Sequence, residues 1–182
     1  MNKFIIEDGI MKAYLGSERK VIVPDGVRQI GGLAENVKDP VEVAPYDSGA
    51  YRAFHSNCDV EEIWLPDSVE IIGFKSLEHC GLIKVLSFSK NTKNFEWNCL
   101  WGCYIEKILY RGTVYEFSKL DFTATHSPSF GKVICEDGEI DFSKSCYIDT
   151  LYFPGTRKQW EEEPHDEWLD RRVRKVVCSD ER

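Results

Sequence analysis

Histidine and cysteine residues occur close together at two places, a pattern that could support thiol catalysis or metal binding. His55 precedes Cys58 in HSNC, and His79 directly precedes Cys80. A nucleophilic cysteine needs a base within hydrogen-bond reach and a lowered pKa, but adjacency in sequence does not orient two side chains together. A structural zinc site typically contains a C-x-x-C pair, which the sequence lacks. We therefore expect no catalytic residue, no metal and no cofactor.

Six of the seven cysteines, all but Cys99, instead follow the spacing of packing positions. Cys135 and Cys178 take the third apolar position of expected strands. Four others precede the first apolar residue of a strand by two or three residues, namely Cys58, Cys80, Cys103 and Cys146. Free buried cysteine behaves as a small apolar residue. The spacing therefore predicts a buried ladder of packed, reduced thiols.

The acidic segment EEEPHDE (161–167) contains one histidine and could in principle carry acid–base chemistry. A solvated face is the simpler interpretation of such a charge run. The chain has no phosphate-binding loop, nucleophile elbow or dinucleotide fingerprint. An enzyme that uses Cys80 with His79, or this acidic segment, is therefore the weaker alternative.

Composition indicates one soluble domain. The chain has 182 residues, of which 42% are hydrophobic and 30% charged, with a net charge of -8 and a pI near 5.1. An acidic chain is a poor partner for nucleic acid or an anionic membrane surface, and no apolar run approaches the roughly 20 residues that span a bilayer. Acidic residues interrupt the N-terminal MNKFIIEDGIMKAY, so we see no secretory signal and expect a cytoplasmic location.

An apolar pattern recurs along the chain with a period of about 22 residues. Each copy has three apolar residues separated by two residues and then by one, as in VEEIWLP and IKVLSFS. The central apolar residues of the copies are Val21, Ile63, Leu86, Ile108, Val133, Leu151 and Val176. A unit of this length cannot bury its apolar side alone, so we expect neighbouring units to stack around a shared core.

A second set of motifs recurs in phase with the first. VPDGVRQIGG (23–32) aligns with LPDSVEIIGF (65–74), and ILYRGTVYEF (108–117) shares Gly-Thr with LYFPGTRKQW (151–160). These motifs resemble the BspA-type leucine-rich repeat family of bacteria, over roughly residues 4–178. The resemblance implies a curved, β-rich solenoid used for binding, in a family often displayed on cell surfaces. A cell-surface or secreted location, if the chain is trimmed, is therefore the alternative to a cytoplasmic one.

We expect a β-rich α/β leucine-rich-repeat solenoid with about seven short strands in one parallel sheet. Irregular or short helical segments would return the chain from one strand to the next. Asp8-Gly9 between alternating apolar residues predicts a tight hairpin. The single domain 1–182 would comprise an N-terminal hairpin cap (1–17), repeats (18–160) with a loop insertion near 33–52, and a C-terminal cap with the last strand (161–182).

Strand alternation places every second residue on the outer face of the sheet. One outward row is mostly apolar or aromatic and contains Ile22, Trp64, Ser87, Leu109, Ile134, Tyr152 and Val177. The row beside it is mostly charged and contains Lys20, Glu62, Val85, Lys107, Lys132, Thr150 and Lys175. An exposed apolar stripe flanked by charge is typical of a contact surface. β-Strand propensity and cover from the 33–52 insertion are alternative explanations.

The sequence therefore predicts a non-catalytic module that recognises a protein partner through its strand face. The expected partner-binding residues are Trp64, Leu109, Ile134, Tyr152, Ile22, Lys107 and Lys132. Self-association is one form of this contact, because a two-fold dimer buries identical patches. Glycan binding, with Trp64 and Tyr152 as stacking platforms, is the main alternative, and a small acidic protein that masks a basic one is another. The partner itself does not follow from the fold.

Overall fold

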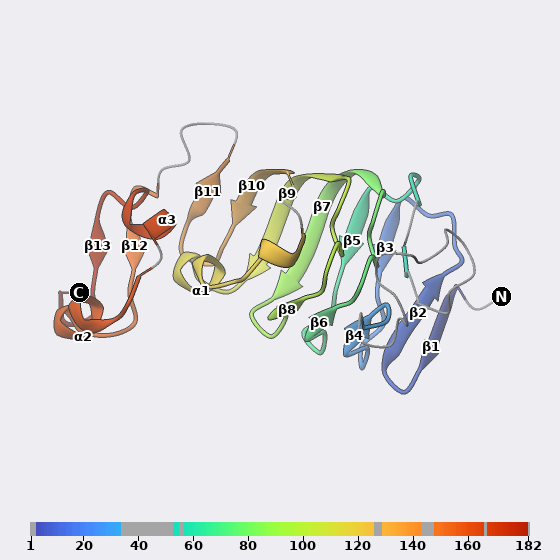
Figure 1. Ribbon diagram of the computed structural model, residues 1–182, viewed down its shortest axis with the longest axis horizontal. Helices are drawn as coiled ribbons and strands as arrows, with labels where there is room; N and C mark the ends of the chain where they lie inside the picture. Colours follow the sequence, from blue (N-terminus) through green and yellow to red (C-terminus); the bar gives the residue numbers. More distant parts are fainter. Residues whose placement is uncertain are drawn as a thin grey trace.

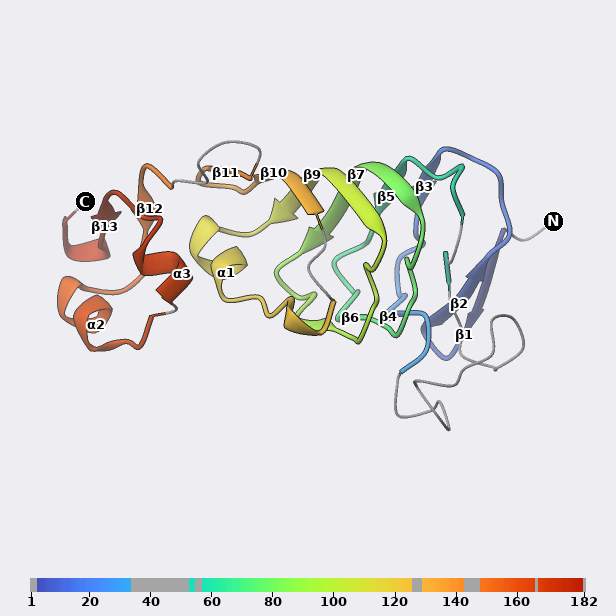
Figure 2. The same ribbon diagram turned by 45° about the horizontal axis from the view of Figure 1, so that its top comes forward.

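Two rows of short strands run along an elongated solenoid. The computed structural model of the chain describes residues 3–33, 53–54, 57–125, 129–142, 148–165 and 167–181. The N-terminal hairpin lies at one end of the molecule and the C-terminal strands lie at the other (Figure 1). A tilted view separates a long row of strands from a shorter return row on the opposite side (Figure 2).

The long row is a six-stranded sheet in the order β11-β10-β9-β7-β5-β3. Its members are β3 (Lys20–Ile22), β5 (Glu62–Trp64), β7 (Gly81–Ser89), β9 (Cys103–Arg111), β10 (Ser129–Ile134) and β11 (Glu139–Asp141). The first five strands run parallel. Their central apolar residues pair across neighbouring strands in the order Val21, Ile63, Leu86, Ile108 and Val133. The predicted repeat and its register are therefore confirmed for these five strands.

The central apolar residues form the middle of the core. Val21 is 2% exposed, and Ile63, Leu86, Ile108 and Val133 are fully buried. Burial of apolar surface contributes about 25 cal/mol per Å², and each of these side chains is covered by the neighbouring rungs. A strand as short as β5 is therefore held mainly by its neighbours rather than by its own hydrogen bonds.

The return row is a second sheet, in the order β1-β2-β4-β6-β8. Its members are β1 (Phe4–Glu7), β2 (Ile10–Tyr14), β4 (Gln29–Ile30), β6 (Ile71–Ile72) and β8 (Asn94–Phe95). The repeated Ile-Gly dipeptide belongs here, because Ile30 pairs with Ile72 and both side chains are buried. A Cβ atom on Gly73 would lie 2.2 Å from the carbonyl oxygen of Gly32, so this close approach of two turns requires glycine.

The N-terminal hairpin extends the return row. β1 and β2 pair antiparallel, and the turn residues Asp8 and Gly9 have φ angles of 52° and 77°. Positive φ at both positions is the requirement of a tight hairpin turn. The predicted hairpin is therefore confirmed, and β2 joins it to the solenoid by pairing parallel with β4.

The Gly-Thr motif marks the starts of two short helices. Thr113 caps α1 (Val114–Ser118) and Thr156 caps α2 (Arg157–Glu162), and each forms a capping box with the third helical residue. Trp160 on α2 is partly buried against the core. In the described ranges, the other helical segments are α3 (Glu167–Asp170) and two short 3-10 helices, Thr123–Thr125 and Ser179–Glu181.

The solenoid fold class is confirmed, but the predicted strands do not all lie in one parallel sheet. β11 turns back and pairs antiparallel with β10, placing Ile140 opposite Val133. It thereby occupies the edge at which the next repeat would pair. The last two strands, β12 (Leu151–Tyr152) and β13 (Val176–Val177), consequently form a separate parallel sheet. The expected insertion, apart from Leu33, lies outside the described residues.

Candidate functional site

The outer face of the six-stranded sheet carries most of the predicted contact row. Across neighbouring strands, Ile22 pairs with Trp64, Trp64 with Ser87, and Ser87 with Leu109. Leu109 in turn pairs with Ile134 on β10. Because side chains alternate along a strand, these five point away from the buried residues that precede them. Five strands therefore present one aligned row of outward side chains.

Exposure along this row is uneven. Ile22 is 66% exposed, and Trp64, Leu109 and Ile134 are half-buried. Ser87 in the middle is only 1% exposed. The row is therefore two apolar pairs, Ile22 with Trp64 and Leu109 with Ile134, on either side of a covered serine.

Trp64 is held in place by two charged neighbours. Its indole Nε1–H donates a hydrogen bond to Glu62 Oε2 at 3.1 Å, and Lys20 Nζ lies 4.6 Å from the centre of its ring. The hydrogen bond from the Trp64 indole lowers the pKa of Glu62, and the nearby Lys20 lowers it by a smaller amount. One part of the ring is therefore already engaged by a cation, which leaves Trp64 a fixed, partly covered anchor rather than an open stacking platform.

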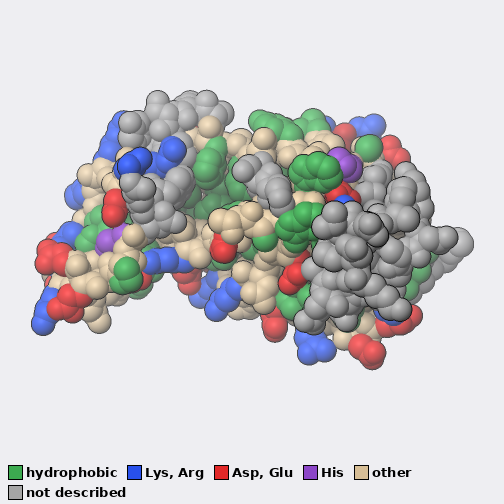
Figure 3. Space-filling model, viewed as in Figure 1, with side chains coloured by type: hydrophobic (Ala, Val, Ile, Leu, Met, Phe, Trp, Pro, Cys, Tyr) green, Lys and Arg blue, Asp and Glu red, His purple; other side chains and the backbone are tan. Residues whose placement is uncertain are grey.

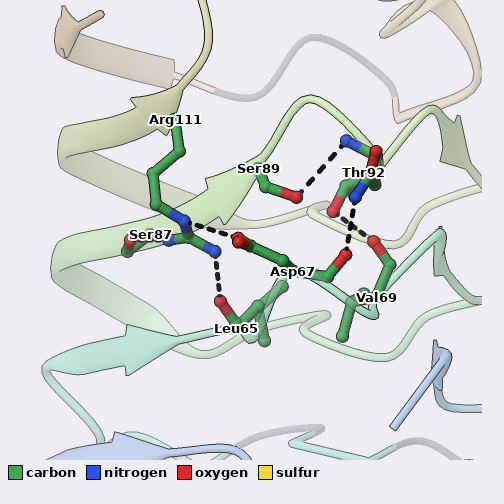
Figure 4. Close-up of polar contacts among 8 residues, drawn as sticks. Leu65, Asp67, Val69, Ser87, Ser89, Thr92 and Arg111 are labelled. Atoms are coloured by element: carbon green, nitrogen blue, oxygen red, sulfur yellow. Dashed lines mark hydrogen bonds and ion pairs between the residues drawn. The ribbon is translucent and has the colours of Figure 1, made fainter. Parts of the chain in front are cut away.

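Arg111 covers Ser87 and divides the row (Figure 4). Its Nη1 donates to Ser87 Oγ at 2.7 Å, and its Nη2 donates to the Leu65 carbonyl at 2.7 Å. Its Nε donates to Asp67 Oδ1 at 2.8 Å. One guanidinium on β9 thus joins groups from β7 and from the end of β5. Its planar set of donors is suited to such a fixed fork of contacts.

Lys107 and Lys132 are neighbours on β9 and β10. Both are half-buried on the sheet. Lys132 Nζ lies 3.0 Å from Glu139 Oε1 on β11, and this hydrogen bond raises the pKa of Lys132. The face therefore carries positive charge beside Leu109 and Ile134, with that of Lys132 partly offset by Glu139.

Tyr152 is placed apart from the other predicted residues. It lies on β12, pairs with Val177 and is 38% exposed. Because β11 takes the open edge of β10, Tyr152 does not continue the hydrogen-bonded row from Ile134. It lines instead an open cavity of about 650 Å³, together with Thr113, Tyr115, Glu116, Asp137 and Pro154.

A second group of exposed apolar residues lies at the starts of β7 and β9 and was not predicted. Leu82, Trp101 and Tyr104 are 48%, 43% and 46% exposed. Leu82 pairs with Tyr104, and the Trp101 ring lies 4.9 Å from the ring of His79. Figure 3 shows hydrophobic side chains gathered over this part of the molecule. Strand alternation applied to the residue before Ile83 and Ile105 would have placed Leu82 and Tyr104 outward.

The chain can now be compared with known families. A family model described as BspA type Leucine rich repeat region matches residues 50–163, in six copies. This span is more than half of the chain. The chain belongs to the BspA-type leucine-rich repeat family. No curated protein and no solved structure matches it.

The cysteines of this BspA-type protein follow the predicted ladder only in part. Cys80 and Cys103 are buried, and their thiols donate to the carbonyls of Phe54 and Leu77, each 26 residues earlier. The prediction for Cys58 is wrong, because Cys58 is exposed. Cys80 and Cys103 each contact a turn of the preceding repeat, whereas the Cys58 thiol instead lies 3.7 Å from the His79 carbonyl. Cys146 lies outside the described residues.

The thiol beside His79 is not prepared for nucleophilic catalysis. Cys80 is fully buried, and the neighbouring Cys103 thiol together with burial raises the pKa of Cys80. A nucleophilic thiol requires the opposite shift. His79 instead packs its ring against Trp101. The BspA-type core therefore uses Cys80 as a packing residue.

Other chemistry suggested by the sequence has no assembled site in the described part of the chain. His55, one of the residues considered for zinc, lies outside it. Across the described ranges, no three His, Cys, Asp or Glu side chains are grouped as a metal site. In the acidic segment, Glu163 is engaged by Lys119 at 2.8 Å and His165 stacks on Trp160. None of the described helices has the length and apolar character needed to cross a membrane.

Proposed function

We propose that this BspA-type repeat protein is a binding module that recognises a protein partner through the outer face of its six-stranded sheet. The observation that carries the proposal is the aligned row in which Ile22 and Trp64 lie on one side of Arg111, and Leu109 and Ile134 lie on the other. Interfaces typically have an apolar centre with a polar rim. Lys107 and Lys132 would form part of that rim.

Rigid placement of the row supports this function. Trp64 is fixed by Glu62 and Lys20, and the surrounding strands are packed against the core. Side chains that are ordered before binding lose less conformational entropy on association. Trp is also among the residues most often found at interface hot spots. Self-association through this face is included in the proposal, because the partner can be a second copy of the chain.

The proposal is tested by capture of partners from native lysate with the wild type and with a Trp64→Ala/Leu109→Ala variant. Loss of two central anchors should reduce capture at least about tenfold, since one hot-spot residue contributes about 2 kcal/mol or more. A Leu82→Ala variant is the matched control, because Leu82 is exposed at the start of β7 and lies outside the row from Ile22 to Ile134. Light scattering of the purified chain measures self-association directly. Unchanged capture by the double variant, with folding intact by circular dichroism, would reject the strand face.

Glycan binding is a second candidate, favoured by the exposure of Trp101 and Tyr104 rather than by Trp64. Trp101 is 43% exposed and Tyr104 is 46% exposed, whereas Lys20 already lies against the Trp64 ring. Saturable binding on a glycan array that is lost in Trp101→Ala, and retained in Trp64→Ala, would favour this function over protein recognition.

A further inference from the structure

An open cavity lies where the six-stranded sheet ends and the two-stranded sheet begins. Its volume of about 650 Å³ falls within the roughly 300–1,000 Å³ typical of ligand pockets. Three segments meet there, namely α1, the turn between β10 and β11, and β12 with the residues that follow it. Thr113, Tyr115 and Glu116 come from the first segment, Asp137 from the second, and Tyr152 and Pro154 from the third.

The cavity wall carries two carboxylates with different surroundings. Asp137 Oδ1 accepts a hydrogen bond from the Val114 N–H at 2.7 Å. Asp137 Oδ2 is buried and has no hydrogen-bond partner among the described residues. Glu116 Oε2 accepts from the Thr113 N–H at 2.8 Å, and Lys90 lies 3.8 Å from its other oxygen. Asp137 is half-buried, and a carboxylate oxygen withdrawn from water is costly unless it is paired, so Asp137 is the group with unused capacity for a cation.

Among the described residues, the cations near the cavity are paired with glutamates, as Lys90 is with Glu116. The Nζ of Lys119, the C-cap residue of α1, lies 2.8 Å from Glu163 Oε1. Glu136, next to Asp137, adds a further negative charge. Burial, followed by the charges of Asp137, Glu136 and Glu116, raises the pKa of the Cys135 thiol to about 12. The end of the sheet beside the cavity is therefore electronegative.

We propose that this cavity receives an arginine side chain from the protein partner, an inference that rests on the proposed recognition function. A guanidinium is planar, weakly hydrated and able to stack on aromatic rings, which suits a cavity bordered by tyrosines and a proline. Tyr152 lines the cavity and is 38% exposed, so its ring offers the guanidinium a surface to stack on. The guanidinium charge then pairs with Asp137.

The test uses the full chain labelled with ¹⁵N and titrated with the peptide acetyl-Gly-Arg-Gly-amide. Amide shifts should concentrate at residues 113–116, 137 and 152. The matching citrulline peptide has the same shape without charge and should bind at least about tenfold more weakly, as expected for loss of a charged hydrogen bond. A lysine peptide should bind more weakly than the arginine peptide, because it cannot stack in the same way.

Two variants separate charge from structure. Asp137→Asn keeps an oxygen that can accept from the Val114 N–H, and it should weaken arginine-peptide binding about tenfold. Glu136→Gln removes an adjacent charge outside the cavity lining and should change binding less than about twofold, as for an exposed charge. Equal thermal stability of the two variants would confirm that folding is unaffected.

Equal binding of the citrulline or lysine peptide, or shifts that map elsewhere, would overturn the inference. Trp64→Ala/Leu109→Ala should bind the arginine peptide like the wild type, because neither residue lines the cavity. If the peptide does not bind while this double variant still loses its captured partner, the cavity inference fails alone. If the peptide binds while the double variant keeps its partner, the proposed strand face fails instead.

Discussion

Arg111 lies over Ser87 and donates to its hydroxyl at 2.7 Å, which reduces the exposure of Ser87 to 1%. The same guanidinium reaches the Leu65 carbonyl and the Asp67 carboxylate. A residue of β9 therefore bonds to groups of the two preceding repeats. This contact divides the outer face of the sheet and also fastens three rungs together.

Arg111→Ala should lower the free energy of unfolding by about 1–3 kcal/mol, the usual cost when a buried polar group loses a charged partner. The Leu65 carbonyl and the Ser87 hydroxyl would both lose a donor. Arg111→Lys should recover only part of the loss, because an ammonium cannot span the same fork of acceptors. Denaturant unfolding measures both variants, and an Arg111→Ala protein as stable as the wild type would contradict the fastening role.

Leu86→Ala should destabilise the protein by about 2–5 kcal/mol, because it leaves a cavity between fully buried neighbours. Leu86 lies between Ile63 and Ile108 in the central row and is 0% exposed. Ile22→Ala, in the outward row and 66% exposed, should change stability by less than about 0.5 kcal/mol. Equal effects of the two substitutions would mean that the inward and outward rows are wrongly assigned.

Cys58 should react with a thiol reagent before the other described cysteines in the folded protein. It is exposed, whereas Cys80, Cys99, Cys103, Cys135 and Cys178 are buried. The thiolate is the reactive form of cysteine. Because the pKa of Cys135 is raised to about 12, very little of its thiol is ionised at neutral pH. Peptide mapping by mass spectrometry after timed labelling gives each rate. Labelling of Cys80 as fast as that of Cys58 would contradict the packing role of Cys80.

The ion pair at the C-terminal end should make stability depend on acidic pH. The hydrogen bond from Arg157, with a smaller contribution from the Cys178 N–H, lowers the pKa of Glu181 from 4.5 to about 2. A depressed pKa means that the contribution is present above pH 4.5 and is lost as pH falls toward about 2. The free energy of unfolding should therefore fall between pH 4.5 and about 2 in the wild type, and it should fall less in Glu181→Gln, which lacks the titrating carboxylate. Thermal unfolding at several pH values tests this, with Glu162→Gln as the exposed control.

Most of the solenoid could be predicted because its repeat fixes both burial and register. The central residues Val21, Ile63 and Leu86 recur at the same place in each unit, and stacking the units pairs them directly. The outward row from Ile22 to Ile134 follows from the same alternation. Residues at the same position in each repeat therefore share the same orientation, and the period of the sequence was enough to predict which of them point inward and which outward.

The end of the long sheet was missed although the sequence contains a signal for it. Asp137-Gly138 is the same dipeptide as Asp8-Gly9 and lies in the turn from which β11 runs back onto β10, although neither residue has the positive φ of the first turn. Recognising this second hairpin would have predicted the break before Leu151. The cover of Ser87 has no comparable signal. Arg111 reaches across two repeats, and such a long side-chain contact does not follow from the period of a strand.

From the reversal of β11 we expect the molecule to unfold in two cooperative units. In the described residues no strand pairing joins β12 or β13 to the long sheet. The C-terminal strands are held to it by side chains, such as Tyr115 against Phe153 at 5.1 Å. In a repeat protein each repeat is stabilised mainly by its nearest neighbours. The C-terminal strands can therefore unfold locally while β7 and β9 stay paired. Their amide hydrogens should therefore exchange with solvent sooner than those of the central strands.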